Sequence, residues 1–119
     1  MSDYDIHQKL NRVSEIMLSV KGRKSGKDIL RPVWFAYDGN TLHLLPVQGS
    51  RTNWYKNMLT GSKLNISVNG VKVLTATGKP ITNSTGVNEV VNKFKSKYGE
   101  GDVKKYYTQF DVDVEARFE

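Results

Sequence analysis

A short basic stretch between two glycines is the part of this sequence with the clearest capacity for chemistry. Gly22 and Gly26 let the backbone turn tightly, so that successive N–H groups can face one anion. Between them Arg23 and Lys24 supply positive charge, and Ser25 supplies a hydroxyl donor. The stretch therefore predicts a phosphate-binding loop. An ordinary solvated turn is the alternative, because tight turns often contain glycine, lysine and serine.

Arg31 follows this loop, in a segment that is predicted to be a strand. Its planar guanidinium can donate two parallel hydrogen bonds to the oxygens of one anionic group. Acidic residues gather elsewhere, since the C-terminal end carries Asp111, Asp113, Glu115 and Glu119. The formal net charge of +6 is thus unevenly distributed, as expected for a site that binds an anionic ligand.

A second cluster combines cationic, amide and aromatic side chains over residues 50–57, with the sequence SRTNWYKN. It lies at the start of a predicted helix, where free backbone N–H groups attract anions. Trp54 and Trp34 together can offer a face to a tricyclic ring, although two tryptophans in a small core are equally ordinary. Tyr106 and Tyr107 follow a long predicted helix and can close over a ligand. Surface tyrosines without a functional role are, however, more common.

Several kinds of chemistry are excluded by what the sequence lacks. It contains no cysteine, which rules out disulfides, thiolate nucleophiles and iron–sulfur or cysteine-zinc sites. His7 and His43 stand alone in the sequence, and we assign neither to a metal site. No nucleophile elbow, Walker loop, HExxH or paired-carboxylate pattern is found, so no catalytic residue is assigned. Any reaction would have to be carried by a cofactor.

The length and the N-terminal composition limit the organisation of the chain. A chain of 119 residues suits one domain over 1–119, because two cores of half that size would bury too little surface. The first eleven residues contain no apolar run that could serve as a signal peptide or cross a membrane. We therefore expect a cytoplasmic protein with no membrane span.

Apolar residues at helical spacing predict three helices. Serine or threonine can cap the second and the third, and a glycine follows each of them. In the second helix we expect Trp54, Met58 and Leu59 to turn inward. The helices cover residues 6–13, the stretch from Ser50 or Thr52 to Leu59, and the stretch from Ser84 or Thr85 to Tyr98.

Alternating apolar and polar residues predict six strands in antiparallel pairs. Asp38-Gly39-Asn40 ends the first arm of one hairpin, and Asn69-Gly70 supplies a type I′ turn for another. Because a barrel removes exposed strand edges, we expect the sheet to curl into one, with a twisted open sheet as the alternative. The strands are predicted at 16–20, 29–37, 41–47, 64–68, 71–81 and 110–118.

The order and spacing of these motifs resemble the deazaflavin (F420)-dependent nitroreductase family, over roughly Val20 to Ile81. That family belongs to the FMN-binding split β-barrels, which are similar to pyridoxamine-phosphate oxidase. The resemblance implies a mainly β fold with flanking helices, a six-stranded antiparallel split β-barrel. The residues that carry it are GRKSG at 22–26, Arg31-Pro32, the hairpin around Asp38-Gly39, Gly49, Trp54-Tyr55 with Asn57, and the strand pair from Leu64 to Ala76.

The same resemblance implies an F420H2-dependent reductase that passes hydride from reduced coenzyme F420 to a quinone, a nitro compound or a similar small organic acceptor. The coenzyme tail contains phosphate and glutamates, which agrees with a basic loop. The loop and Arg31 would hold the phosphate, and 47–49 would lie along the ring. The cofactor-binding residues implied are Arg23, Lys24, Ser25, Arg31, Pro32, Val47, Gln48, Gly49, Arg51, Trp54 and Asn57.

Other functions remain open on the sequence. The nearest alternative is a split-barrel oxidoreductase that uses FMN, or a flavin carrier without catalysis. A small basic barrel that binds nucleic acid is a more distant alternative. Single-strand binders usually expose several aromatic residues along one groove, whereas the basic residues of this chain are bunched as if for one phosphate group. We expect a small-molecule electron acceptor as partner, no nucleic acid, and a homodimer, since split barrels commonly pair.

Overall fold

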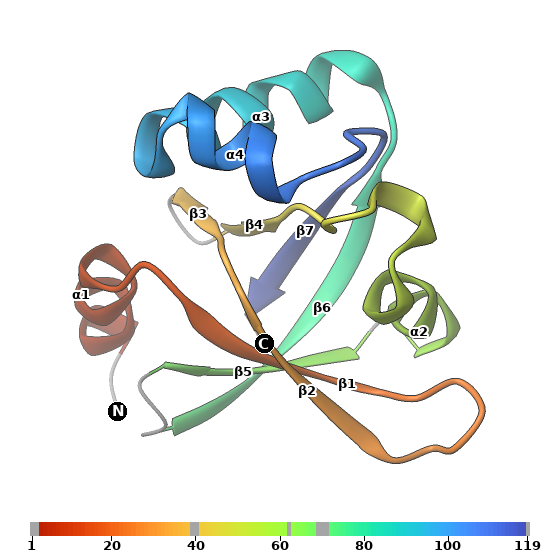
Figure 1. Cartoon of the computed structure of the whole chain (residues 1–119). Coiled ribbons are helices and arrows are strands. Elements are labelled where there is room, and N and C mark those ends of the chain that lie inside the picture. Colours follow the sequence, from red (N-terminus) through yellow and green to blue (C-terminus); the bar gives the residue numbers. More distant parts are fainter. Residues whose placement is uncertain (1–2, 39–40, 62, 69–71, 119) are drawn as a thin grey trace.

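The computed structural model describes residues 3–38, 41–61, 63–68 and 72–118, and it contains one curled antiparallel sheet with helices around it (Figure 1). The sheet has seven strands in the order β2-β1-β5-β6-β7-β4-β3. The predicted turn at Asn69-Gly70 lies outside the described residues. The strands are β1 (Ile16–Lys21), β2 (Asp28–Val33), β3 (Ala36–Asp38), β4 (Thr41–Leu44), β5 (Lys63–Val68), β6 (Lys72–Ile81) and β7 (Asp113–Phe118).

The curl of the sheet follows from the connection between its two edge strands. β2 and β3 lie at opposite edges in the strand order, yet only Trp34 and Phe35 separate them along the chain. Three Cα–Cα steps reach about 11 Å at most, so the two edges must approach each other. The result is a split β-barrel, which confirms the predicted class.

The predicted strand 29–37 is wrong in one respect, because it breaks into β2 and β3 and raises the strand count from six to seven. At the break, the backbone of Phe35 is bound by a helix instead of a strand. Its N–H donates to the Tyr98 hydroxyl at 3.0 Å, and its carbonyl accepts from Lys97 Nζ at 2.9 Å. Such contacts satisfy the backbone groups that a sheet partner would otherwise satisfy.

The helices are placed around the barrel as Figure 1 shows, with α2 at one end and α3 with α4 across another side. In α2, Trp54 and Met58 are buried as expected, but Leu59 is 52% exposed, so its predicted inward position is wrong. The cap of α3 is Asn83 rather than Ser84 or Thr85, because the Asn83 side chain accepts from the Gly86 N–H at 2.7 Å. The helices are α1 (Asp3–Arg12), the 3₁₀ turn η1 (Gly49–Arg51), α2 (Asn53–Gly61), α3 (Ser84–Tyr98) and α4 (Glu100–Tyr106).

Two groups of buried apolar residues hold these elements together. The larger fills the barrel, where alternate residues of β1 such as Ile16, Leu18 and Val20 point inward. The smaller lies between the sheet and α3 and includes Phe94 and, from the unpredicted α4, Val103. Among the described residues, no helix is both long and apolar enough to cross a membrane.

Candidate functional site

Three adjoining cavities form a groove from the β1–β2 loop to α4. The basic cavity, of about 280 Å³, shares Arg31 and Trp54 with the middle cavity, of about 270 Å³. The middle cavity shares Pro32, Val33, Val47 and Trp54 with the aromatic cavity, of about 290 Å³. Each is near the lower limit of typical ligand pockets, about 300 Å³, and together they suit an elongated ligand.

Each cavity has its own set of lining residues. The basic cavity is lined by Gly22, Arg23, Lys24, Ser25, Ile29, Arg31, Asn53, Trp54 and Asn57. The middle cavity is lined by Arg31, Pro32, Val33, Val47, Gln48, Thr52, Asn53 and Trp54. The aromatic cavity is lined by Glu15, Pro32, Val33, Trp34, Leu45, Val47, Trp54, Tyr106 and Tyr107.

Four backbone N–H groups of the basic loop, those of Gly22, Arg23, Gly26 and Lys27, are bonded within the protein, so these four do not contribute to the expected backbone cradle. The Gly22 N–H donates to the Lys27 carbonyl at 2.8 Å, and the Gly26 N–H donates to the Gly22 carbonyl at 2.9 Å. The Lys27 N–H donates to Ser25 Oγ at 3.2 Å. These bonds close a tight turn, with Gly26 at a φ of 69°, and the turn places Arg23, Lys24 and Ser25 along the basic cavity.

Arg23 is held in place by Asn57 of α2. Asn57 is only 6% exposed, and its Oδ1 accepts both the Arg23 backbone N–H at 3.2 Å and the guanidinium Nη1 at 2.7 Å. The pairing joins the loop to the helix across 34 positions of sequence. A guanidinium has five N–H donors, so this contact orients Arg23 and leaves donors for a ligand.

Arg31 reaches the groove because of the strand register. It pairs directly with Leu18, a buried residue of β1, so both side chains lie on the inward face of the β1–β2 ribbon. Its Nη1 donates to the Leu30 carbonyl at 3.2 Å. No described carboxylate forms an ion pair with Arg23, Lys24 or Arg31.

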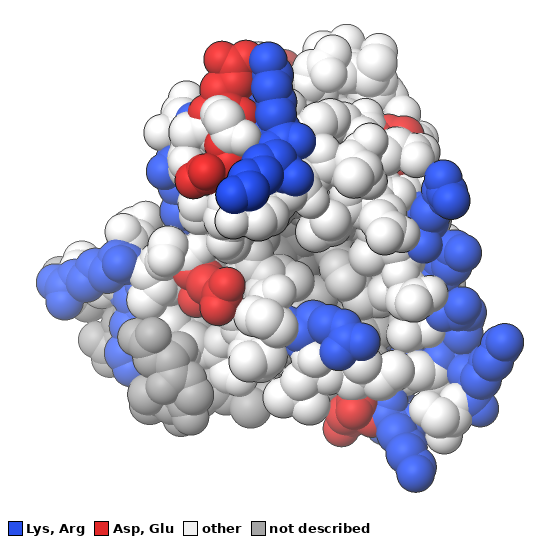
Figure 2. Space-filling view, in the orientation of Figure 1, with Lys and Arg blue, Asp and Glu red and all other residues white. Residues whose placement is uncertain are grey.

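The charge distribution on one face agrees with this arrangement. Figure 2 shows a row of basic side chains along the edge formed by α2 and the β1–β2 ribbon, and others over α1 and α4, whereas the surface between the α2 edge and α4 is mainly uncharged. A ligand with an anionic tail and a flat apolar ring would match the two regions.

The loop over the middle cavity is tied to the segment before β7. Gly49 has a φ of 58°, and a Cβ at this position would collide with the Asp111 carboxylate. That carboxylate accepts from the Ser50 N–H at 2.9 Å, the Ser50 hydroxyl at 2.6 Å and Gln109 Nε2 at 2.9 Å. Burial would raise the pKa of Asp111, but the bonds from Ser50 and Gln109 outweigh it and lower the pKa.

The walls of the aromatic cavity are rigid because their rings contact one another. Trp34 stacks on Tyr98 with ring centroids 4.2 Å apart and planes 9° apart, and it meets Tyr106 edge-on at 5.6 Å. Burial raises the pKa of Tyr98 to about 12 and that of Tyr107 above its usual range. Both phenols are therefore protonated at neutral pH.

The structure brings most of the predicted cofactor residues to the groove, and Gly49 and Arg51 are the exceptions. Gly49 packs against Asp111, and Arg51 is exposed in η1 without lining a cavity. Sequence reasoning did not single out Glu15, Ile29, Val33 or Leu45. The β1–β2 pairing brings the first three to the groove, and Leu45 follows β4 near the other edge of the sheet, so no local pattern marks them.

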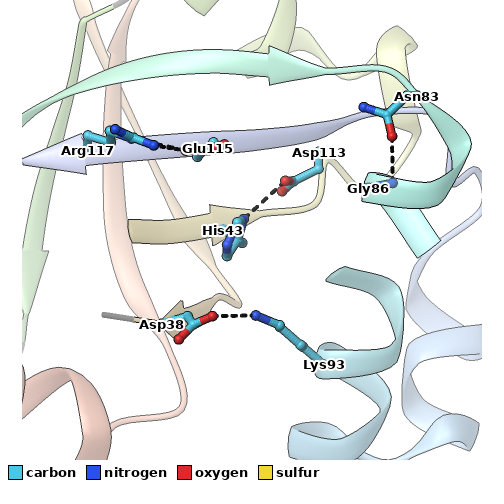
Figure 3. A network of polar contacts seen from close by, with 8 residues as sticks. All are labelled: Asp38, His43, Asn83, Gly86, Lys93, Asp113, Glu115 and Arg117. Atoms are coloured by element: carbon cyan, nitrogen blue, oxygen red, sulfur yellow. Dashed lines mark hydrogen bonds and ion pairs between the residues drawn. The ribbon is translucent and has the colours of Figure 1, made fainter. Parts of the chain in front are cut away.

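A separate polar cluster lies beneath α3, away from the groove (Figure 3). His43 Nδ1 is 3.1 Å from Asp113 Oδ2, and Lys93 Nζ is 2.7 Å from Asp38 Oδ2. The sequence-based view of His43 as isolated is therefore wrong. Its carboxylate partner is 70 positions away in sequence and is brought to it by the β4–β7 pairing.

Comparison with known proteins gives one family. The family model described as F420H2-dependent quinone reductase matches residues 2–114. No protein with a curated description matches the sequence.

Several solved structures share the fold at low sequence identity. An F420H2-dependent reductase, FDR-A, is 15% identical with a TM-score of 0.66, covering 87% of this chain and 94% of its own. A Listeria innocua protein named for pyridoxamine 5′-phosphate oxidase is 10% identical with a TM-score of 0.74, covering 98% and 92%. A structure named as a domain-swapped dimer is 14% identical with a TM-score of 0.67, covering 98% and 100%. At these identities the likeness establishes the fold alone.

Proposed function

The chain belongs to the F420H2-dependent quinone reductase family, and from this premise we propose that its groove holds coenzyme F420 beside a small organic acceptor. The family makes the protein an oxidoreductase and F420 its coenzyme. When bound and reduced, that coenzyme supplies a hydride and a proton, which together convert a quinone to its hydroquinone and leave the coenzyme oxidised.

The donor set of the basic cavity fits the tail of such a coenzyme. Arg23, Lys24 and Arg31 have no described carboxylate as ion-pair partner, so their charge is available to phosphate. The Ser25 hydroxyl accepts from the Lys27 N–H and can still donate its own hydrogen. The observation that carries the proposal is this concentration of three cations for which no described carboxylate forms an ion pair.

The middle cavity fits a planar ring next to that tail. Pro32 and Val47 are apolar, Trp54 is shared with both neighbouring cavities, and Gln48 adds an amide. Asn57 would contribute by orienting Arg23. Gly49 would contribute because its missing side chain lets its own loop pass close to Asp111.

Arg51 is the remaining predicted site residue, and its contribution is less direct. It lines none of these three cavities, and we assign it only a longer-range attraction for the glutamates of the tail.

Titration with oxidised F420 and, separately, with FMN tests the assignment, with the fluorescence of each flavin as the readout. We expect F420 to bind more tightly, and its affinity to fall as salt is raised, because the contacts are to exposed cations. Reduced F420 mixed with menadione should then be oxidised in the presence of the protein. Failure to bind F420 would refute the proposal.

FMN is the second candidate, since the fold is shared with a protein named for pyridoxamine 5′-phosphate oxidase. Preference for FMN in the same titration would favour this alternative. Binding of either flavin without turnover of any acceptor would instead identify a carrier.

We also propose a homodimer that works in the cytoplasm. Support for the dimer is the similar structure named as a domain-swapped dimer. Gel filtration with light scattering would measure the mass, and a monomer at micromolar concentration would contradict the dimer.

A further inference from the structure

The aromatic cavity contains one charged side chain among walls that are otherwise apolar or neutral. Val33, Leu45, Trp34, Trp54 and Tyr106 supply the apolar and aromatic surface. Glu15 is the only charged residue among the described residues that line it. The basic cavity, by contrast, is lined by three cations.

The shape of the cavity limits what it can hold. Its volume of about 290 Å³ lies near the lower end of the range for ligand pockets, about 300 Å³, so it suits one ring or two fused rings. Trp34 is fixed by its stacking on Tyr98 and its edge contact with Tyr106. Flat aromatic walls of this kind favour a planar guest.

Glu15 precedes β1, and its side chain is exposed at the edge of the cavity. An exposed glutamate carries a negative charge at neutral pH. Lys105 contacts the Tyr106 ring, with Nζ 5.3 Å from the centroid, but it does not line the cavity. A ligand in the cavity therefore meets one negative charge at close range, where like charges repel.

We propose that Glu15 makes the aromatic cavity selective for uncharged planar acceptors of one or two rings, such as a simple quinone, and excludes anionic ones. This inference rests on the proposed function, because it assigns the acceptor end of the same groove. The two ends then have opposite charge. The cations attract the anionic coenzyme tail, and Glu15 prevents anions from occupying the acceptor end.

The test uses the protein without coenzyme and reads tryptophan fluorescence. The chain has two tryptophans, and Trp54 lines all three cavities, whereas Trp34 lines only the aromatic one of the three. In a Trp54→Phe background, quenching of Trp34 fluorescence would give affinities for menadione, which is uncharged, and for a naphthoquinone sulfonate, which is anionic. In the wild type we expect the sulfonate to bind about tenfold more weakly, as a single like charge at short range in a partly solvated site implies.

Variants of Glu15 isolate the charge. Glu15→Gln should bring the two affinities to within about threefold without changing menadione binding, and Glu15→Lys should favour the sulfonate. Glu89→Gln, an exposed substitution on α3, is the matched control and should leave the ratio as in the wild type. Equal affinities in the wild type, or a ratio unchanged by both Glu15 variants, would overturn the proposal.

The turnover arm separates this inference from the proposed function. With reduced F420, the ratio of kcat/KM for the two quinones should change in Glu15→Gln as the binding ratio does, while F420 affinity stays constant. Failure to bind F420 together with intact quinone discrimination would refute the coenzyme assignment and support the role of Glu15. F420-dependent turnover without discrimination between the two quinones would support the coenzyme assignment and refute the role of Glu15.

Discussion

The basic cavity and the polar cluster beneath α3 both concentrate charged side chains, but they differ in pairing. Beneath α3, Lys93 contacts Asp38 at 2.7 Å, and His43 contacts Asp113 at 3.1 Å (Figure 3). In the basic cavity, Arg31 and its neighbours have no described carboxylate as ion-pair partner.

The difference in pairing indicates a difference in role. Charges that are matched within the fold contribute to its stability and specificity, whereas charges left unmatched on one side of a cavity are available to a ligand. Substitutions in the two regions should therefore separate stability from coenzyme affinity.

The largest effect is expected beneath α3, from His43→Ala. Asp113 is 1% exposed, and its Oδ1 has no hydrogen-bond partner among the described residues, so removing His43 leaves the buried carboxylate without its counterpart. We expect a loss of about 3 kcal/mol in the free energy of unfolding at neutral pH, measured with urea, and unchanged F420 affinity. Arg117→Ala, which breaks the surface pair with Glu115, should cost less than about 1 kcal/mol.

The cost of His43→Ala should also depend on pH. Burial raises the pKa of Asp113 above 3.8, although the bond from His43 opposes this rise. A carboxyl with a raised folded-state pKa favours folding when it is protonated, and this contribution is lost as pH rises through that pKa. The destabilisation should therefore shrink as pH falls toward 4, and a constant difference from pH 4 to 7 would contradict a buried ionised Asp113.

Arg31→Ala should produce the opposite result, a loss of ligand affinity with little change in stability. A hydrogen bond to a charged group contributes about 1.5 to 3 kcal/mol, so F420 binding should weaken by that amount. Lys79→Ala, which removes an exposed cation of β6, is the control for net charge. Equal weakening by both variants would mean that only the overall charge matters.

Asn57→Ala should affect both quantities, because Asn57 is buried and also orients Arg23. Its Oδ1 accepts from the Arg23 backbone and guanidinium, and both donors would lose their partner. We expect stability and F420 affinity each to fall by about 1 kcal/mol. Loss of stability alone would show that the orientation of Arg23 does not matter for the ligand.

The smallest effect concerns Lys97, which supports the break between β2 and β3 but is exposed to solvent, so screening reduces the effect of its pKa shift on stability. Burial lowers its pKa to about 8, so between pH 8 and 10.5 the unfolded chain holds a proton that the folded chain lacks. Stability should therefore rise with pH in this window, and Lys97→Met should remove the rise. Urea unfolding between about pH 8 and 9 keeps the ionisation of tyrosines in the unfolded state small, and identical slopes in the two proteins would contradict the assignment.

Local patterns were enough to predict much of this fold. The alternation of apolar and polar residues predicted β1 and β5, and the helical spacing of Val87, Val90 and Phe94 predicted α3. Both patterns arise because an element that is buried on one face repeats apolar residues with its own structural period. The short helix α4 escaped notice, since within it only Val103 is buried.

The candidate site was predicted in part for the same reason. The side chains of the basic loop are adjacent in the sequence, so their concentration of charge is visible without a structure. The bonds that occupy the N–H groups of Gly22, Arg23, Gly26 and Lys27 are not visible in this way.

The sequence thus specified the residue types, their periodicity and the local excess of positive charge, because each depends on neighbours a few positions apart. Only the tertiary structure decided that Trp34 and Phe35 turn the corner of the barrel, that Asp113 meets His43, and that Glu15 lies beside the aromatic rings. Those relations depend on how strands far apart in the chain pair and curl, and no short-range pattern encodes them.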